Sequence, residues 1–379
     1  MAGGYFKLAY KCKDMQTQVT RVQSNRIEKP IRITEQVWPE STVPLVTVRC
    51  ITYNHANFIR DAIEGFLMQE TTFPLEIIIH DDASTDGTAQ IVKEYQAKFP
   101  HLFRIILQKE NQFSKGNSKP FEDIYASARG EFLAYCEGDD FWISKEKLQK
   151  QVEYLENHPG CGMVFSDLNI ENITTKKYMS RIRKSDGYIY PLTLSIEQTI
   201  GEGCEQTQIA RWPWTCTAVV RTKLRQLLAK SDPYLHSKGT FLLGDVQLWA
   251  ELAVISEITY IPECFATYRI LDTSLTNSNN WKKTVIFFES FFKMKLYLCE
   301  KHKLSEHIRR NTEVNWIKKS LQLSLIDKNT KLAEEVKRTK RKFTWYHWIM
   351  YFRIKYKVIY YGYKLAVRVR DVLLKRMPR

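Results

Sequence analysis

The stretch Glu137-Gly138-Asp139-Asp140 is the part of this chain from which its fold is best inferred. It follows a short apolar run, residues 132–135, and it is closed by Phe141 and Trp142. Ionised carboxylates are rarely buried unless they are paired or bind a cation. At the carboxyl end of a strand in an open α/β sheet, they lie where such sheets bind ligands. Their oxygens suit Mg²⁺ or Mn²⁺, which usually also hold substrate phosphates, whereas the alternative is a solvated acidic turn.

A second acidic loop lies earlier in the chain. Residues 76–80, Glu-Ile-Ile-Ile-His, form a β-branched run without Gly or Pro, which predicts a strand. The strand ends in Asp81 and Asp82, and a helix is predicted from residue 89 to about residue 99. Polar residues between them can cap that helix, but capping does not account for two adjacent carboxylates. Such carboxylates can accept hydrogen bonds from a base N–H or from ribose hydroxyls.

Strands and helices alternate through the first half of the chain. A predicted strand over residues 44–51 runs into Thr52-Tyr53-Asn54-His55, and apolar residues at helical spacing follow from Ile59 to Leu67. Residues 103–107 predict a further strand. Alternation of this kind favours an α/β fold with a mostly parallel sheet, whose loops gather at one edge.

Taken in order, Thr52-Tyr53-Asn54-His55, the acidic loop after residue 80 and Glu137-Gly138-Asp139-Asp140-Phe141-Trp142 resemble the motifs of family 2 glycosyltransferases. The resemblance runs from about Leu45 to about Thr276. It implies the GT-A fold, which is Rossmann-like, with a mostly parallel central sheet flanked by helices. The run Lys-Leu-Gln-Lys-Gln at 147–151 is similar to the subgroup that makes bacterial surface polysaccharides.

The resemblance also implies roles for single residues. The nucleotide pocket would be lined by Thr52, Asn54, Asp81 and Asp82, with one of the two aspartates on the base. Glu137 and Asp139 would stand for the family's Asp-x-Asp motif. Asp139 would then be the main ligand of Mn²⁺ or Mg²⁺, and Glu137 would contact the ribose or a metal-bound water. The family usually has Asp at the position of Glu137.

Transfer of a sugar from a nucleotide diphosphate also needs a base for the acceptor hydroxyl, because a metal ion stabilises only the leaving diphosphate. Asp245 is the candidate, and it lies where a helix is predicted to begin, within residues 242–249. From the residues alone, Asp245 could equally be a helix cap. The resemblance implies that it is the catalytic base.

Three further positions are weaker candidates. Trp214 and Thr215 are predicted on the acceptor side, because amphipathic rings suit ligand pockets, while core packing beside a proline turn is the alternative. Arg269 is a candidate for contact with the diphosphate, and a structural ion pair is the alternative. Many relatives carry Tyr-Arg-x-His here, and that histidine can complete the metal site. In this chain Leu271 stands at the histidine position, and the alternatives are that Asp272 replaces it or that the metal relies on the donor phosphates and water.

The ends of the chain differ from its middle in composition. From Lys337 to Arg379 there are 14 lysines and arginines against one acid, Asp371, and many aromatic residues. Basic residues mixed with Trp and Tyr are typical of a segment that lies on a membrane surface. A nucleic-acid-binding tail or a helix for a partner protein are the alternatives. We therefore expect an N-terminal extension over 1–40, a GT-A domain over 41–276, a helical region over 277–336 and a membrane-associating tail over 337–379.

The sequence contains no Gly-x-Gly-x-x-Gly, Walker, His-Glu-x-x-His or Gly-x-Ser-x-Gly motif, which disfavours dehydrogenases, ATPases, metalloproteases and serine hydrolases. We expect an inverting, metal-dependent glycosyltransferase with a nucleotide-sugar donor, UDP first, and a glycan or lipid-linked acceptor. We expect it in the cytoplasm, peripheral on the inner face of the membrane. The alternatives are a nucleotidyltransferase, and a non-catalytic protein whose tail docks on nucleic acid or a partner.

Overall fold

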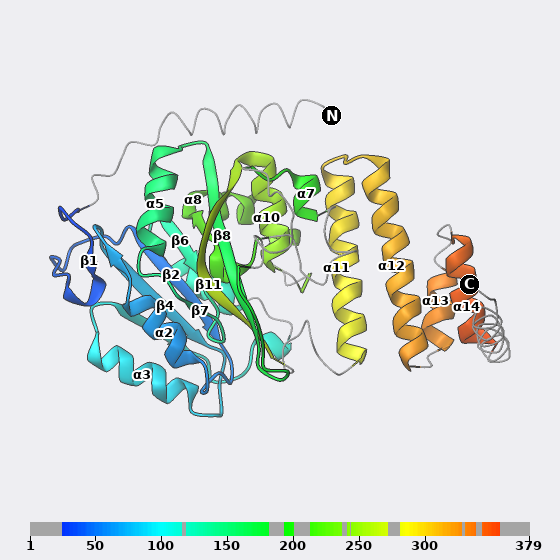
Figure 1. Ribbon diagram of the computed structural model, residues 1–379, viewed down its shortest axis with the longest axis horizontal. Helices are drawn as coiled ribbons and strands as arrows, with labels where there is room; N and C mark the ends of the chain where they lie inside the picture. The colour runs from blue at the N-terminus through cyan, green and yellow to red at the C-terminus, as the bar shows by residue number, and fades with distance from the viewer. Residues whose placement is uncertain are drawn as a thin grey trace, which may run out of the picture. The chain divides into compact units, whose positions relative to one another are not determined.

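The computed structural model describes residues 25–115, 119–181, 193–200, 213–236, 241–242, 244–271, 281–327, 330–338 and 343–356. The chain divides into two compact units, Met1–Leu271 and Asp272–Arg379. The first is built on a β-sheet with helices against it, and the described part of the second is helical (Figure 1).

The first unit contains a nine-stranded sheet. Its main path runs in the order β5 (Phe103–Leu107), β4 (Leu75–Asp81), β2 (Val46–Thr52), β6 (Phe132–Tyr135), β10 (Val219–Arg221), β8 (Cys161–Asn172), β11 (Glu257–Ile270) and β7 (Phe141–Trp142). β9 (Lys177–Met179) pairs with β8, and a small separate sheet joins β1 (Ile31–Arg32) to β3 (Glu70–Thr71). The predicted strands near 44–51, 76–80, 103–107 and 132–135 are confirmed.

The sheet is parallel where the sequence predicted it to be. The four strands β5, β4, β2 and β6 run parallel to one another, and β8 and β11 form a second parallel pair. β10 and β7 are antiparallel insertions. Residues 161–172, 219–221 and 257–270 were not predicted as strands, and they make the sheet mixed in its second half.

Helices connect and cover these strands. In the first unit they are α2 (Ile59–Leu67), α3 (Thr88–Lys98), α4 (Lys119–Ser127), α5 (Lys147–Asn157), α7 (Ile196–Ile200), α8 (Thr222–Ser231), α9 (Pro233–His236) and α10 (Gly244–Ile255). Short 3₁₀ turns lie at η1 (Ile33–Glu35), η2 (Phe113–Lys115) and η3 (Thr215–Thr217). The helix predicted at 89–99 is α3, displaced by one residue.

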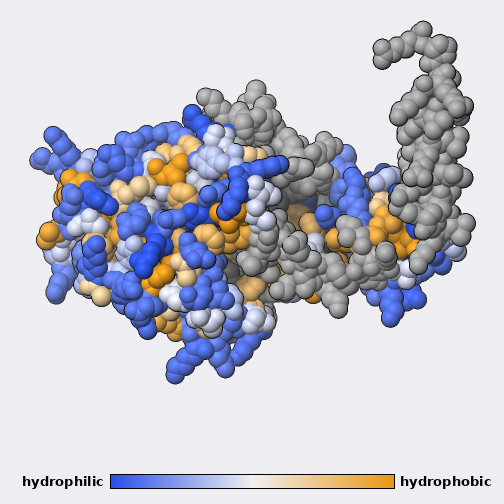
Figure 2. Space-filling model, turned by 60° about the horizontal axis from the view of Figure 1, so that its bottom comes forward, coloured by the Kyte–Doolittle hydropathy of each residue, from blue (hydrophilic) through white to orange (hydrophobic). Residues whose placement is uncertain are grey.

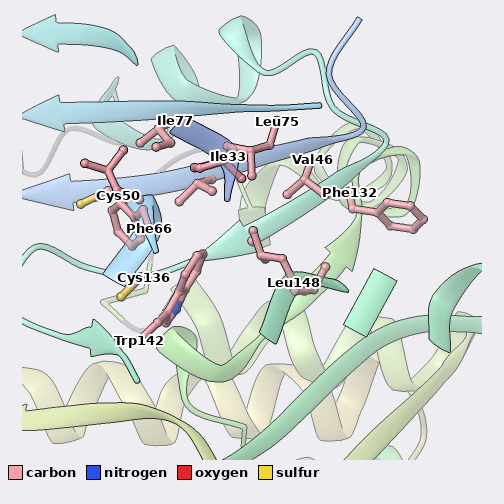
Figure 3. Packing of buried hydrophobic residues seen from close by; sticks show 14 of the residues in the cluster. Ile33, Val46, Cys50, Phe66, Leu75, Ile77, Phe132, Cys136, Trp142 and Leu148 are labelled. Carbon is pink, nitrogen blue, oxygen red and sulfur yellow. The ribbon is translucent and has the colours of Figure 1, made fainter. Parts of the chain in front are cut away.

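The pleat of β6 divides the core into two layers, because successive side chains of a strand point to opposite faces. Phe132 and Ala134 pack in a cluster with residues of α2 and α5. Leu133 and Tyr135 pack on the other face, in a cluster with residues of α8 and α10. In the first layer the rings of Phe66 and Trp142 meet edge to face, with centroids 4.8 Å apart (Figure 3).

The second unit has four described helices: α11 (Trp281–Lys301), α12 (Glu306–Asp327), α13 (Thr330–Arg338) and α14 (Trp345–Lys355). α12 contacts the other three. Buried apolar residues include Met294, Leu298, Ile317 and Leu321, and apolar side chains also reach the surface of this unit, as the orange atoms in Figure 2 show. Among the described residues, we find no helix that is both long and apolar enough to cross a lipid bilayer.

Candidate functional site

The two acidic loops meet at the carboxyl end of β2. The backbone N–H of Gly138 donates to the carbonyl of Ile51 at 2.9 Å, and that of Asp82 donates to the carbonyl of Thr52 at 3.0 Å. A Cβ added at Gly138 would lie only 2.6 Å from Thr52 Oγ1, so a larger residue would push the loop away from the strand. The predicted convergence of the loops at one sheet edge is confirmed.

Asp81 and Asp82 are both buried, and each carboxylate accepts hydrogen bonds from backbone N–H groups that compensate its burial. Asp81 accepts from the N–H of Ser84 at 3.0 Å. Asp82 accepts from the N–H groups of Gln112 and Phe113, at 2.8 and 3.0 Å. The structure supplies partners for both carboxylates, because Ser84 lies three residues after Asp81 and the loop after β5 folds over Asp82. Their proposed contact with a nucleotide remains a prediction, beside this role in shaping the loops.

Asn54 links the loop after β2 to the loop after β4. Its N–H donates to Ser84 Oγ at 2.8 Å, and its Oδ1 accepts from the N–H of Thr85 at 2.9 Å. Asn54 and Ala83 have positive φ angles of 56° and 66°. This region is uncommon for residues other than glycine, and asparagine tolerates it better than alanine does. The two loops therefore hold a strained backbone together at the site.

The Glu137–Asp140 loop presents two carboxylates with different surroundings. Glu137 Oε1 accepts from Arg49 Nη1 at 2.6 Å, whereas its Oε2 is buried and has no hydrogen-bond partner among the described residues. Asp139 is half-buried, and its Oδ2 lies 3.8 Å from His55 Nε2. Burial raises the pKa of Asp139, while the nearby His55 opposes that shift. Both carboxylates thus retain capacity for a ligand.

Asp140 and Arg269 belong to the scaffold behind this loop. Asp140 is buried and accepts from the backbone N–H of Arg269 at 2.9 Å. The Arg269 guanidinium pairs with Glu171 at 3.1 Å and with Asp61, and it lies 4.3 Å from the ring centroid of Phe141. These contacts match the structural ion pair that the sequence left open. A diphosphate contact by Arg269 remains a prediction.

Asp245 lies in the first turn of α10, half-buried. Burial raises its pKa to about 6, and the nearby charge of Glu137 adds to the shift. A hydrogen bond from the Val246 backbone and the charge of Arg49 oppose it. Asp245 is therefore within electrostatic range of the acidic loop, although more than 100 residues separate them in sequence. A carboxylate with this pKa can exchange protons near neutral pH, as a general base must.

The residues at the loop fit a divalent cation in part. Mg²⁺ and Mn²⁺ prefer oxygen ligands, and Mg²⁺ is usually held by one or two carboxylates together with substrate phosphates and water. Glu137 Oε2 and the Asp139 carboxylate are such oxygens. Within the part of the chain that is described, no group of three or more His, Cys, Asp or Glu side chains is arranged to hold a metal ion. The protein would supply only part of the coordination.

Trp214 and Thr215 lie at the turn that precedes β10. The Trp214 ring lies 4.1 Å from the Tyr268 ring, centroid to centroid, and it packs against the core. Its Nε1–H is buried and has no acceptor among the described residues. Trp214 therefore packs in the core and also keeps an indole N–H that has no acceptor among the described residues. Leu271 is buried, and Asp272, the possible replacement for the relatives' histidine, lies outside the described residues.

Sequence reasoning missed Arg49 and His55 as parts of this site. Arg49 lies within the predicted strand over residues 44–51, and His55 lies in the motif that follows it. The signal was available for Arg49, because a charged residue at the centre of the run Val-Thr-Val-Arg-Cys-Ile needs a buried partner. His55 is the last residue of the Thr-Tyr-Asn-His motif, but its approach to Asp139 depends on the fold and has no counterpart in the sequence.

The flanked, partly parallel sheet with acidic loops at the carboxyl ends of its strands is the arrangement expected of the GT-A fold. Residues 47–221 match the model of the family described as glycosyl transferase family 2. This part of the chain is therefore a family 2 glycosyltransferase domain, and the resemblance seen in the sequence is confirmed.

Several known proteins are similar to this chain. An uncharacterized protein of Mycobacterium tuberculosis is 46% identical over 125 residues, 33% of this chain and 35% of that protein, so the match spans about a third of its length. TuaG of Bacillus subtilis, described as a teichuronic acid biosynthesis glycosyltransferase, is 27% identical over 63% of this chain and 84% of its own. The solved structure of S. aureus TarS 1–349 with UDP-GlcNAc is 15% identical, with a TM-score of 0.46 over 82% of this chain and 79% of that chain.

Proposed function

We propose that this chain transfers a sugar from a nucleotide diphosphate donor, UDP-linked by preference, to a hydroxyl of a glycan or lipid-linked acceptor, with inversion at the anomeric carbon. One observation carries the proposal. Glu137, whose Oε2 has no hydrogen-bond partner among the described residues, lies within electrostatic range of Asp245, whose pKa is about 6, and Asp139 follows two residues later in the same loop. The description of TuaG supports a role in surface-polysaccharide synthesis.

In this proposal the loops after β2, β4 and β6 bind the donor. Thr52 is assigned to the nucleotide because its Oγ1, buried beside Gly138, has no hydrogen-bond partner among the described residues. Asn54, Asp81 and Asp82 shape the pocket through their backbone hydrogen bonds, and one of the two aspartates would turn an oxygen to the base. Rigid loops of this kind reduce the entropy lost when the donor binds.

Glu137 and Asp139 would hold a divalent cation, which when bound stabilises the negative charge that develops on the leaving diphosphate. Asp245 accepts the proton of the acceptor hydroxyl. The acceptor oxygen then forms a bond to the anomeric carbon from the face opposite the diphosphate. The bond between that carbon and the diphosphate oxygen breaks with its electron pair on the oxygen. The products are the glycoside and the nucleoside diphosphate, and Asp245 holds the proton until it passes to solvent.

We assign the acceptor side to Trp214 and Thr215, because Trp214 keeps an open indole donor beside an aromatic surface. Arg269 is too occupied by Asp61 and Glu171 to be a strong diphosphate ligand on its own. Its cationic charge, which also acts on Asp139, still favours an anionic ligand nearby.

We further propose that α14 and the basic residues around it contact an anionic membrane surface. One face of α14 packs inward through Met350, Tyr351 and Ile354. The other face exposes apolar and aromatic residues at helical spacing: Trp345, Trp348, Ile349, Phe352 and Tyr356. Exposed Trp and Tyr beside lysine and arginine suit the depth of lipid headgroups. This face supports a membrane over nucleic acid, since phosphate contacts alone would not favour the apolar stripe.

The test is calorimetric titration of the purified full chain with UDP, with and without Mn²⁺, followed by assay of UDP release from UDP-sugars in the presence of acceptor. We expect metal-dependent binding and transfer. The Asp139→Ala variant should lose the metal-dependent part of UDP binding, whereas Asp61→Ala, on the scaffold side of Arg269, should keep most of it. Donor binding without any transfer or hydrolysis would favour the non-catalytic alternative. Equal binding by wild type and Asp139→Ala would refute the metal assignment.

A further inference from the structure

We infer that Arg49 is a positioning residue: its buried guanidinium fixes Glu137 so that one oxygen is engaged and the other faces the ligand. This inference rests on the proposed function, because it concerns the same nucleotide and metal site. The family resemblance implies no role for Arg49, and the inference is based on the contacts of its side chain.

The placement of Arg49 is unusual for a charged residue. It lies in β2, between the parallel strands β4 and β6, and its side chain is only 3% exposed. Its neighbours on the strand, Val48 and Cys50, belong to the core on the opposite face. The pleat therefore directs Arg49 to the face where α10 packs. A charge buried there is costly unless it is paired, so a specific partner is required.

Glu137 is that partner. Arg49 pairs in register with Tyr135 of β6, and its guanidinium lies 5.1 Å from the centroid of the Tyr135 ring. It then reaches Glu137, two residues further on and on the same face, with Nη1 2.6 Å from Oε1. The Tyr135 ring in turn meets Trp249 of α10 edge to face, at a centroid distance of 5.6 Å. Asp245 lies one turn before Trp249 in the same helix.

Two consequences follow for the site. Because Oε1 of Glu137 is held by Arg49, the side chain has one preferred orientation, and Oε2 is left without a partner among the described residues. The positive charge of Arg49 also opposes the repulsion between Glu137 and Asp245, so that the two carboxylates can share this face. Glutamate at position 137 thus reaches Arg49 with one oxygen and leaves the other without a partner among the described residues.

The experiment compares Arg49→Met, Arg49→Lys and Glu137→Gln with the wild-type full chain, by calorimetric titration with UDP and Mn²⁺ and by thermal unfolding. We expect Arg49→Met to weaken metal-dependent UDP binding at least about tenfold, a change that corresponds to about 1.4 kcal/mol. Arg49→Lys should restore part of the affinity, because it keeps the charge but not the geometry of the guanidinium. Arg221→Met is the matched control: Arg221 lies in β10 and pairs with Glu131 at the opposite end of β6, so its loss should lower the melting temperature without changing the affinity.

The double variant Arg49→Met/Glu137→Gln separates positioning from a general effect on the fold. Removing both partners leaves no unpaired buried charge, so this variant should fold even if Arg49→Met alone does not. If Arg49 acts only through Glu137, the double variant binds UDP as Glu137→Gln does. Affinity in Arg49→Met equal to that of the wild type, or losses that add in the double variant, would overturn the inference. No nucleotide binding by the wild type would overturn the proposed function first, and the inference with it.

Discussion

At the scale of single residues, the proposed mechanism makes turnover depend most on Asp245, its general base. Removing a general base typically slows a reaction by 10²- to 10⁴-fold, roughly. We therefore expect Asp245→Asn to reduce kcat by about that factor while the Kd for UDP stays within about twofold of wild type, since Asp245 does not belong to the donor loops. Single-turnover transfer rates and calorimetry measure the two quantities. Turnover near the wild-type level would show that another group takes the proton.

The pKa of Asp245 also predicts how activity depends on pH. Because burial raises that pKa to about 6, the carboxylate is protonated below pH 6 and cannot accept a proton. The rate should therefore rise with pH through about 6 and level off above about 7. A pH profile of kcat/KM measures this limb. A profile that is flat from pH 5 to 8 would exclude Asp245 as the titrating base, and the profile of Asp245→Asn should lack the limb.

At the scale of elements, the joint between α5 and β7 contains a buried lysine. Lys147 begins α5, is fully buried, bonds to Gln151 and lies 4.7 Å from the centroid of the Trp142 ring. Burial lowers the pKa of Lys147 to about 7, whereas that of an exposed lysine is 10.5. The unfolded chain thus binds more protons between pH 7 and 10.5, so this group makes the fold more stable as pH rises through that window.

Lys147→Met should accordingly be more stable than the wild type. The difference in stability should be largest at pH 7 and below, and it should shrink as the pH approaches 10. The loss of the hydrogen bond to Gln151 changes the melting temperature of the variant by a similar amount at every pH, so it does not affect this trend. Melting temperatures of both proteins at pH 6.5, 8 and 9.5 measure the difference. Lys150→Met is the control, because Lys150 on the same helix is partly exposed and pairs with Glu146 and Glu263. A constant difference across this range would contradict the lowered pKa.

At the scale of the whole molecule, the exposed stripe of α14 is the surface that we propose to contact an anionic membrane. Trp345 is 75% exposed, and Trp348, Phe352 and Tyr356 stack along the helix, with neighbouring ring centroids 5.6 and 6.0 Å apart. The combined change of Trp345, Trp348 and Phe352 to Gln should lower binding to vesicles that contain anionic lipid several-fold. Co-sedimentation measures it. Ile286→Gln, which removes an exposed apolar residue from α11, should leave binding unchanged.

Salt provides a second readout for this surface. The cationic part of the attraction is screened within about 8 Å at physiological ionic strength, whereas burial of the aromatic rings is not. We expect wild-type binding to weaken but persist at high salt, and the triple variant to lose its residual binding there. Equal loss in both proteins would indicate that the stripe does not enter the lipid. If the triple variant still bound nucleic acid at low salt but no longer bound vesicles, nucleic acid would be favoured as the partner of this surface.

The sequence by itself determined the first half of the fold and most of the candidate site. Regular alternation of apolar strands and amphipathic helices is a local property, so β2, β4, β5 and β6 and the loops at their carboxyl ends could be read directly. The family motifs lie in those loops. They therefore pointed to Thr52, Asp81, Asp82, Glu137 and Asp139 before any contact was known.

The tertiary structure decided what depends on distant partners. Backbone hydrogen bonds from Gln112 and Phe113 compensate the burial of Asp82, and Asp61 and Glu171 pair with Arg269. These partners are far apart in the sequence, so the sequence alone does not predict the contacts. The pKa of Asp245 and the pairing of Arg49 with Glu137 depend on burial, which the whole fold creates. A sequence shows which groups can be charged, but the environment that sets the cost of each charge forms only when the strands and helices pack together.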